Sequence, residues 1–162
     1  MKILSRLMLA ACLVLPLAAC KKDEGPKQAV QAPMAAPADE NVDAWRAYVQ
    51  DIVPRHMEGV TNSPYVYFLP GESAPDFADQ ALRMGDKIKA DVSRGIVSGN
   101  MLAYASPASA KMADMIIAAF QPVPPASMKG VKVLFIGQAA DNERVKAAVE
   151  PAGVNYVFVE AK

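Results

Sequence analysis

The stretch Val131-Lys132-Val133-Leu134-Phe135-Ile136 is the strongest strand signal in the chain, and it decides the fold class. β-branched and aromatic residues follow one another there with one polar interruption, between the turn residues Gly130 and Gly137. An almost continuous apolar run of this kind is typical of a strand that is covered on both faces. We therefore expect neighbouring side chains of this strand to be buried even though they point in opposite directions.

Strand and helix signals alternate in both directions from this stretch. Three stretches between the strands carry apolar residues at helical spacing, and Asn41 is placed to cap a further helix around Trp45. The strands are expected at 65–69, 101–105, 131–136 and 154–159. This alternation predicts an α/β fold with a small, mainly parallel four-stranded sheet and helices on both faces. We expect the strand order 2-1-3-4, with the N-terminal helix over one face or edge of the sheet.

Two helix starts carry capping signals. Ser73-Ala74-Pro75-Asp76 resembles a capping box with the acid at the third helical position. Ser106-Pro107 has the pattern of an N-cap followed by proline at the first helical position. The mixed charges at 86–91 predict a helix face exposed to solvent.

Ligands of parallel α/β sheets bind outside the carboxyl ends of the strands, so the loops there are the first place to look for a site. Three such loops are expected, at 70–73, 106–109 and 137–142. Their candidate ligand-binding residues are Ser73, Ser106, Ser109, Gly137 and Asn142.

None of these loops carries a recognisable catalytic signature. Gly137 stands alone where a dinucleotide fingerprint needs three glycines, and the chain has no Gly-Lys-Ser or Gly-Lys-Thr phosphate loop. Ser106 lacks the Gly-x-Ser-x-Gly pattern of a hydrolase nucleophile. His56 is the single histidine, too few for a typical metal site. We therefore expect no enzyme activity, no cofactor and no metal.

The N-terminus carries the clearest functional signal. A basic start, an apolar core of about a dozen residues and then Leu17-Ala18-Ala19-Cys20 form a secretory signal that ends in a cysteine. This segment resembles the lipobox of bacterial lipoproteins. The resemblance implies cleavage before Cys20, a diacylglyceryl group on its thiol, a fatty acyl chain such as palmitate on its freed amine, and membrane anchoring. Lys21, which is not acidic, implies transfer to the outer membrane, with the domain facing the periplasm.

Three segments are therefore expected: a signal peptide at 1–19, a lipidated cysteine and disordered Ala/Pro-rich tether at 20–39, and one α/β domain at 40–162. After cleavage fifteen bases and seventeen acids remain, a net charge of −2, which argues against nucleic-acid binding. Only one cysteine remains, so no disulfide can form within the chain.

The function expected from these signals is that of a cell-envelope lipoprotein whose domain binds or positions another envelope protein without catalysis. Two alternatives stay open. One is a small-ligand-binding domain, or an enzyme with a weak signature, that uses the strand-end loops. The other is an accessory or immunity lipoprotein of a secretion system.

Overall fold

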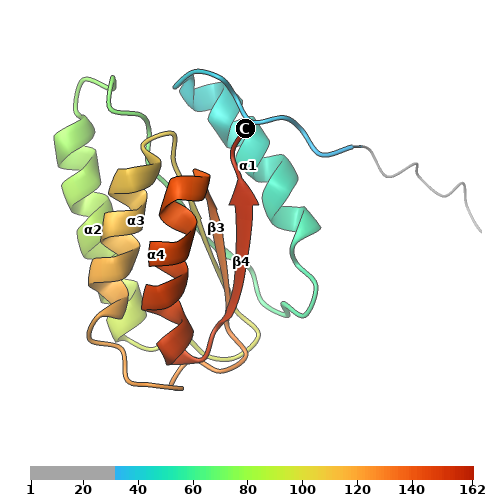
Figure 1. Ribbon diagram of the computed structural model, residues 1–162, viewed down its shortest axis with the longest axis vertical. Coiled ribbons are helices and arrows are strands. Elements are labelled where there is room, and N and C mark those ends of the chain that lie inside the picture. Colours follow the sequence, from blue (N-terminus) through green and yellow to red (C-terminus); the bar gives the residue numbers. More distant parts are fainter. Residues whose placement is uncertain (1–31) are drawn as a thin grey trace, which may run out of the picture. The chain divides into compact units, whose positions relative to one another are not determined.

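The sheet is parallel throughout, as the alternation of strands and helices predicts. The protein is seen here in a computed structural model, which describes residues 32–162. The strands in that part of the chain are β1 (Tyr65–Phe68), β2 (Met101–Ala105), β3 (Lys132–Gly137) and β4 (Asn155–Glu160). Every neighbouring pair is parallel, and the α/β class is confirmed (Figure 1).

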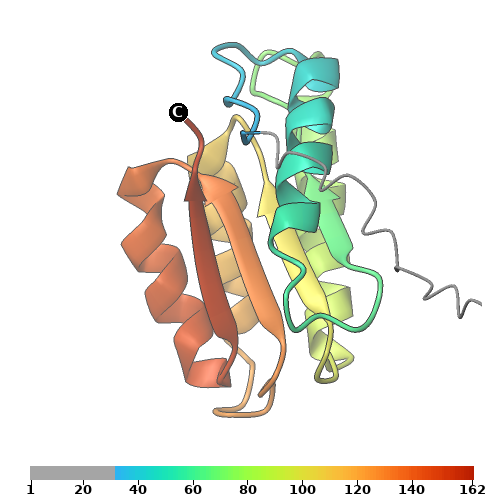
Figure 2. The same ribbon diagram turned by 90° about the vertical axis from the view of Figure 1, so that its right-hand side faces the viewer.

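The expected strand order 2-1-3-4 is wrong, because the strands lie in the order β1-β2-β3-β4. Each crossover therefore steps in the same direction across the sheet. Right-handed crossovers that all step in one direction place their helices on the same face. These helices are α2 (Phe77–Ser93), α3 (Ser109–Phe120) and α4 (Ala139–Val149). They form one layer, and α1 (Val42–Arg55) covers the opposite face (Figure 2).

The two faces of the sheet carry separate cores. Phe135 points into the core under α2, α3 and α4, whereas Leu134 and Ile136 point into the core under α1. All three side chains have no exposed surface. Adjacent residues of β3 are thus buried on opposite faces, as the apolar run predicts for a central strand.

One of the three predicted helix caps is confirmed, and two are wrong. Asn41 caps α1 as expected, because its side-chain oxygen accepts a hydrogen bond from the Ala44 N–H at 2.9 Å. The predicted capping box is wrong, since α2 begins only at Phe77 and Ser73 does not cap it. The predicted N-cap role of Ser106 is also wrong, because α3 begins at Ser109 and has Ala108 at its N-cap.

α1 alone covers its face of the sheet, and the chain before it lies against it. Trp45 and Ile52 are buried in this core. The Trp45 indole N–H donates to the Asp39 carbonyl at 2.8 Å, and the Met34 N–H donates to the Asp51 carboxylate at 2.9 Å. Ala36 packs against the same core. Residues 32–39, expected as the end of a tether, thus make contacts with the domain. The rest of that tether and the signal segment lie outside the described residues.

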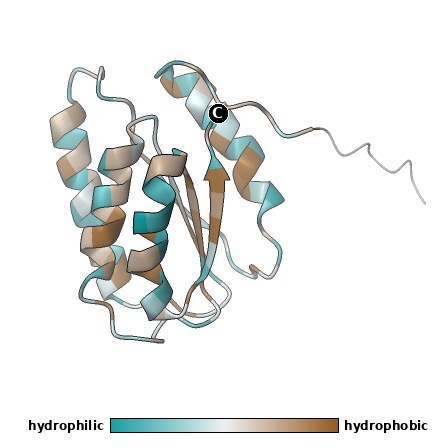
Figure 3. Cartoon of the chain, viewed as in Figure 1, coloured by the Kyte–Doolittle hydropathy of each residue, from teal (hydrophilic) through white to brown (hydrophobic). Residues whose placement is uncertain are grey.

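Both edges of the sheet are less covered than its centre. β4 is hydrophobic over much of its length (Figure 3), but its side chains are only half-buried or exposed. β1, at the opposite edge, exposes Tyr65 and Val66. Helix layers of this width bury the central strands completely and leave apolar surface at the borders.

Candidate functional site

The carboxyl ends of β2, β3 and β4 surround a hollow of about 390 Å³, where ligands of parallel sheets usually bind. Two of the predicted ligand residues, Ser106 and Gly137, line it. The other three, Ser73, Ser109 and Asn142, do not. The remaining lining residues are Trp45, Pro107, Gln138, Ala161, Lys162 and the segment 36–40. The structure thus brings together only part of the predicted site.

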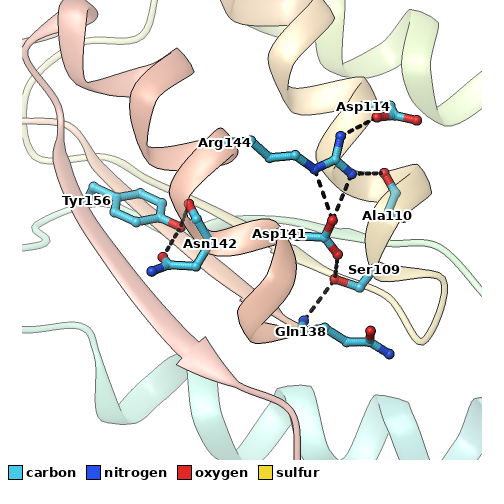
Figure 4. A network of polar contacts seen from close by, with 8 residues as sticks. All are labelled: Ser109, Ala110, Asp114, Gln138, Asp141, Asn142, Arg144 and Tyr156. Carbon is cyan, nitrogen blue, oxygen red and sulfur yellow. Dashed lines mark hydrogen bonds and ion pairs between the residues drawn. The ribbon is translucent and has the colours of Figure 1, made fainter.

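Ser109 and Asp141 join the first turns of α3 and α4 (Figure 4). The Ser109 hydroxyl donates to the Asp141 carboxylate at 2.6 Å and accepts a hydrogen bond from the Gln138 N–H at 2.8 Å. Both side chains are buried. The Ser109 hydroxyl therefore has a donor and an acceptor within the protein, and it fixes the loop after β3 against α3.

Arg144 completes this network on its outer side (Figure 4). Its guanidinium donates two hydrogen bonds to Asp141, at 2.8 and 2.9 Å. It also donates to the Asp114 carboxylate at 2.5 Å and to the Ala110 carbonyl at 2.9 Å, and both acceptors belong to α3. These bonds raise the pKa of the Arg144 guanidinium and tie α4 to α3. The network holds helices together, and its one guanidinium is paired with two carboxylates, those of Asp141 and Asp114.

Asn142 and Ser73 also have partners within the protein. The Tyr156 hydroxyl donates to the Asn142 side-chain oxygen at 3.0 Å, which fixes α4 against β4. The Ser73 hydroxyl and N–H both donate to the Glu40 carboxylate, at 2.5 and 2.9 Å. These bonds lower the pKa of Glu40. Ser73 thus ties the loop after β1 to the residues that precede α1.

Ser106 and Gly137 form the wall of the hollow. The Ser106 hydroxyl oxygen accepts a hydrogen bond from the Ala108 N–H at 2.9 Å, a turn that leads into α3. Gly137 is required by close approach, because a Cβ there would lie 2.5 Å from the Phe135 ring and 2.6 Å from the Ser109 hydroxyl. Gly137 was expected as a ligand-binding residue, and its packing against Phe135 and Ser109 explains the glycine without reference to a ligand.

A second polar cluster lies under α2, and the sequence analysis missed it. Asp91 is only 5% exposed, so its expected place on a solvent-exposed face is wrong. The Tyr67 hydroxyl donates to its carboxylate at 2.9 Å, Lys87 donates at 2.8 Å, and Arg94 pairs with its other oxygen. Burial raises the pKa of Asp91, but the bonds from Lys87, Tyr67 and Arg94 outweigh it, so the pKa lies below its ordinary value.

The Tyr104 ring stacks on the Tyr67 ring with a centroid distance of 5.0 Å. Its hydroxyl is fully buried and has no hydrogen-bond partner within residues 32–162. Burial raises the pKa of this hydroxyl, which therefore stays neutral. A signal for the cluster was present in the sequence, because Lys87 and Arg94 stand four and three residues from Asp91, at distances that allow ion pairs on one helix.

Besides Met34, the large apolar side chains that are exposed in the described chain lie on two surfaces of the domain. The first, called here the edge patch, is the β1 edge with Tyr65 and Val66, which point to opposite faces of the sheet, together with Val97 in the turn before β2; they are 42%, 45% and 71% exposed. Val97 belongs to the turn whose Gly99 carbonyl accepts hydrogen bonds from the chain just before β1. The second surface is a groove between α2 and α3 with Leu82 on its rim. The groove also has charged side chains on both of its sides, Asp86 and Lys89 on α2 and Lys111 and Asp114 on α3.

Within residues 32–162 no three His, Cys, Asp or Glu side chains gather as a metal site would require. His56 follows α1, where burial and then the Lys132 charge lower its pKa. No helix in the described part of the chain is long and apolar enough to cross a membrane. Cys20 and the lipobox lie outside the described residues.

Comparison of the chain with known protein families, curated proteins and solved structures found no match.

Proposed function

We propose that the protein is a bacterial envelope lipoprotein, anchored in the outer membrane through acylated Cys20, whose α/β domain binds another envelope protein without catalysis. The lipobox-like segment Leu17-Ala18-Ala19-Cys20 supports the anchor. An anchor with two or more acyl chains holds a domain stably at a membrane. The domain would then meet partners in the periplasm.

The polar side chains at the strand ends support a binding role rather than a chemical one. Ser109, Asp141 and Arg144 bond to one another and to the loops beside them. Ser73 and Asn142 are held in the same way by Glu40 and Tyr156. A general base or nucleophile must instead reach a substrate atom from its place in the site. These residues position the loops, and that is the role we assign to them.

The edge patch is the observation that carries the proposal. Tyr65 and Val66 lie on an edge strand, where backbone groups along one side face no further strand of the described chain. Exposed apolar side chains beside an open strand edge form a surface that a partner chain can cover by pairing with the strand and burying the side chains. Val97 is a third exposed apolar side chain, in the turn that accepts hydrogen bonds from the chain just before β1.

The hollow at the strand ends favours a second function, the binding of a small ligand. Its volume of about 390 Å³ is within the range of small-molecule sites. The buried Ser106 hydroxyl lines this hollow. Its oxygen accepts a hydrogen bond from the Ala108 N–H, and the hydroxyl donates to no group within residues 32–162, so it can donate to a ligand. The loops around it are fixed by the contacts described above, which would keep such a site in shape.

A photo-activated cross-linking side chain at position 97 tests the main proposal in intact cells. We expect an adduct between the anchored chain and another envelope protein. The matched control is the same side chain at Asn155, which is also exposed and begins the strand at the opposite edge of the sheet. The adduct should be missing there, and Tyr65→Asp should remove it at position 97.

Equal adducts at positions 97 and 155 would mean random capture in a crowded membrane, and no adduct at either would contradict a protein partner at this edge. The small-ligand function makes a different prediction. In that case Gln138→Trp, which fills the mouth of the hollow, should abolish function in cells while Tyr65→Asp has no effect.

A further inference from the structure

The groove between α2 and α3 is an apolar surface that the proposed function does not use. The two helices lie side by side on the outer layer of the domain (Figure 1). The groove between them has a volume of about 480 Å³. Small side chains and one methionine form its floor: Ala78, Ala81, Gly85, Met115 and Ala118. A second hollow that shares Lys89 and Ala118 continues it towards the C-terminal end of α2.

Leu82 projects from the rim of this groove and is 66% exposed. It is a large apolar side chain on a helix whose other outward positions are mostly charged or small. Burying it would remove one of the largest exposed apolar side chains of the domain from water. The groove thus carries a protruding apolar group and a shallow hollow within one turn of the same helix.

Gly85 lines the groove, and because it has no side chain it leaves the hollow open. Glycine inside a helix is less favourable than alanine, because it has more conformational freedom to lose. The Gly85 backbone does not have a positive φ. A Cβ at this position would meet only Met115, at 3.7 and 3.9 Å, which are ordinary contact distances. Neither the backbone nor the packing of the described chain requires glycine here, and the absence of a side chain leaves space open at the surface of the groove.

The charges on the rim are balanced. Asp86 and Lys89 line the α2 side, and Lys111 and Asp114 line the α3 side. Asp114 pairs with Arg144. The other three charged groups of the rim form no hydrogen bond or ion pair with residues 32–162. An occupant that offers one acid to Lys111 and one base to Asp86 would complement this rim.

We propose that a second copy of this chain occupies the groove and forms a symmetric dimer. A two-fold interface must be self-complementary, because the same surface serves both copies. This groove meets that condition, since it supplies Leu82 as a protrusion, the space above Gly85 as a hollow, and charges of both signs. The two α2 helices pack antiparallel, and each Leu82 fills the hollow at Gly85 of the other copy.

This arrangement also places the charges correctly. Gly85 lies level with Met115 of α3, so Lys111, one turn earlier, lies level with Ala81. In an antiparallel pair that sets Leu82 opposite Gly85, Ala81 is opposite Asp86 of the second copy. That Asp86 therefore comes beside Lys111. The two-fold axis repeats the contact, so the dimer gains two ion pairs.

Cross-linking of the full chain in cells tests the dimer. Arg83→Cys is treated with a bis-maleimide, and we expect a product with the mass of two copies, because the proposed register sets position 83 opposite position 84 of the second copy, beside the two-fold axis, and leaves Leu82 in place. Ala147→Cys is the matched control, because position 147 is also exposed but lies on α4, outside the groove. It should give no such product, and neither should the chain without an added cysteine. Gly85→Leu in the Arg83→Cys chain should remove the product by filling the hollow.

Charge reversal tests the predicted register. In the Arg83→Cys chain, Asp86→Lys and Lys111→Asp should each cause loss of the two-copy product, because each sets like charges together. The two reversals combined should restore it. Equal products from positions 83 and 147, a product with a different protein, or no product at all would each overturn the proposal. So would failure of the double reversal to restore the product while the variant remains folded by circular dichroism.

This test does not depend on the edge patch. A dimer without an adduct at position 97 would leave the self-association standing and contradict the proposed function. An adduct at position 97 with a monomeric chain would do the reverse.

Discussion

Tyr67 and Tyr104 stack on each other under α2, but their hydroxyl groups differ in hydrogen bonding. The Tyr67 hydroxyl bonds to buried Asp91, whereas the Tyr104 hydroxyl has no partner within the described residues. A buried hydrogen bond to a charged group contributes about 1.5–3 kcal/mol, and a buried hydroxyl without a partner contributes nothing that its removal would lose. Tyr67→Phe should therefore lower the free energy of unfolding by about 1.5–3 kcal/mol, while Tyr104→Phe should leave it unchanged or raise it. Urea unfolding of both variants measures the difference. Equal losses would indicate that the Tyr104 hydroxyl is bonded to an internal water.

Asp91 itself makes stability depend on pH. Its pKa in the folded protein lies below the value of about 3.9 typical of unfolded chains. Its contribution to stability is therefore fully present above that value and is lost as pH falls through the lower, folded pKa. Asp91→Asn should be less stable than the native chain at pH 7, and the gap should narrow below about pH 4. Urea unfolding at pH 7 and pH 3 checks this, and a gap of constant size would contradict it.

The central strand β3 provides a test of the layered fold at the scale of the element. Phe135 lies under three helices, and Ile136 lies under α1. Phe135→Ala should cost about 3–5 kcal/mol and Ile136→Ala about 2–5 kcal/mol, because each leaves a cavity in a different core. Val97→Ala, at an exposed position, should change stability by less than about half a kcal/mol. A negligible loss at Ile136 would mean that α1 does not cover its face of the sheet in solution.

Elements were easier to predict than their arrangement. The apolar pattern of β3 is local, and so are the stripes of the helices, which is why strands and helices fall where the sequence indicates. The strand order is not local, because it depends on the direction of each crossover. The expected order reversed the first crossover, and that would have put α2 on the face that α1 occupies. The residues around Trp45 predict a helix, but their pattern does not indicate how much of the sheet that helix covers.

The candidate site was predicted less well, for the same reason. The sequence showed which polar residues follow the strands, but their partners come from distant segments. Ser73 bonds to Glu40 and Ser109 bonds to Asp141, so both are occupied by groups that no local pattern connects to them. Asp91 was misplaced because charge spacing alone does not reveal that Tyr67 stands beneath it.

At the scale of the whole molecule, the contacts of residues 32–39 bear on where the domain begins. Trp45 donates to the Asp39 carbonyl, and Ala36 covers part of the core under α1. A chain that starts at Ala32 should therefore be more stable than one that starts at Glu40, by about 1 kcal/mol for the lost hydrogen bond and packing. Thermal and urea unfolding of the two chains measure this difference. Equal stability would support a tether that extends to residue 39.

The anchor decides whether the protein acts at a membrane at all, and Cys20 carries that prediction. The lipobox resemblance implies that the peptidase cleaves only after the Cys20 thiol has received its diacylglyceryl group. Cys20→Ser should therefore accumulate as an uncleaved precursor that incorporates no labelled palmitate. Cys12→Ser is the matched control, because Cys12 lies within the apolar stretch of the expected signal and would be removed with it. That variant should be processed, labelled and recovered with the outer membrane like the native chain. Labelling of Cys20→Ser, or equal loss of labelling in both variants, would contradict the lipobox assignment. The proposed role as an anchored binding domain would then fail with it, whereas the dimer predicted at the α2–α3 groove would remain open to its own test.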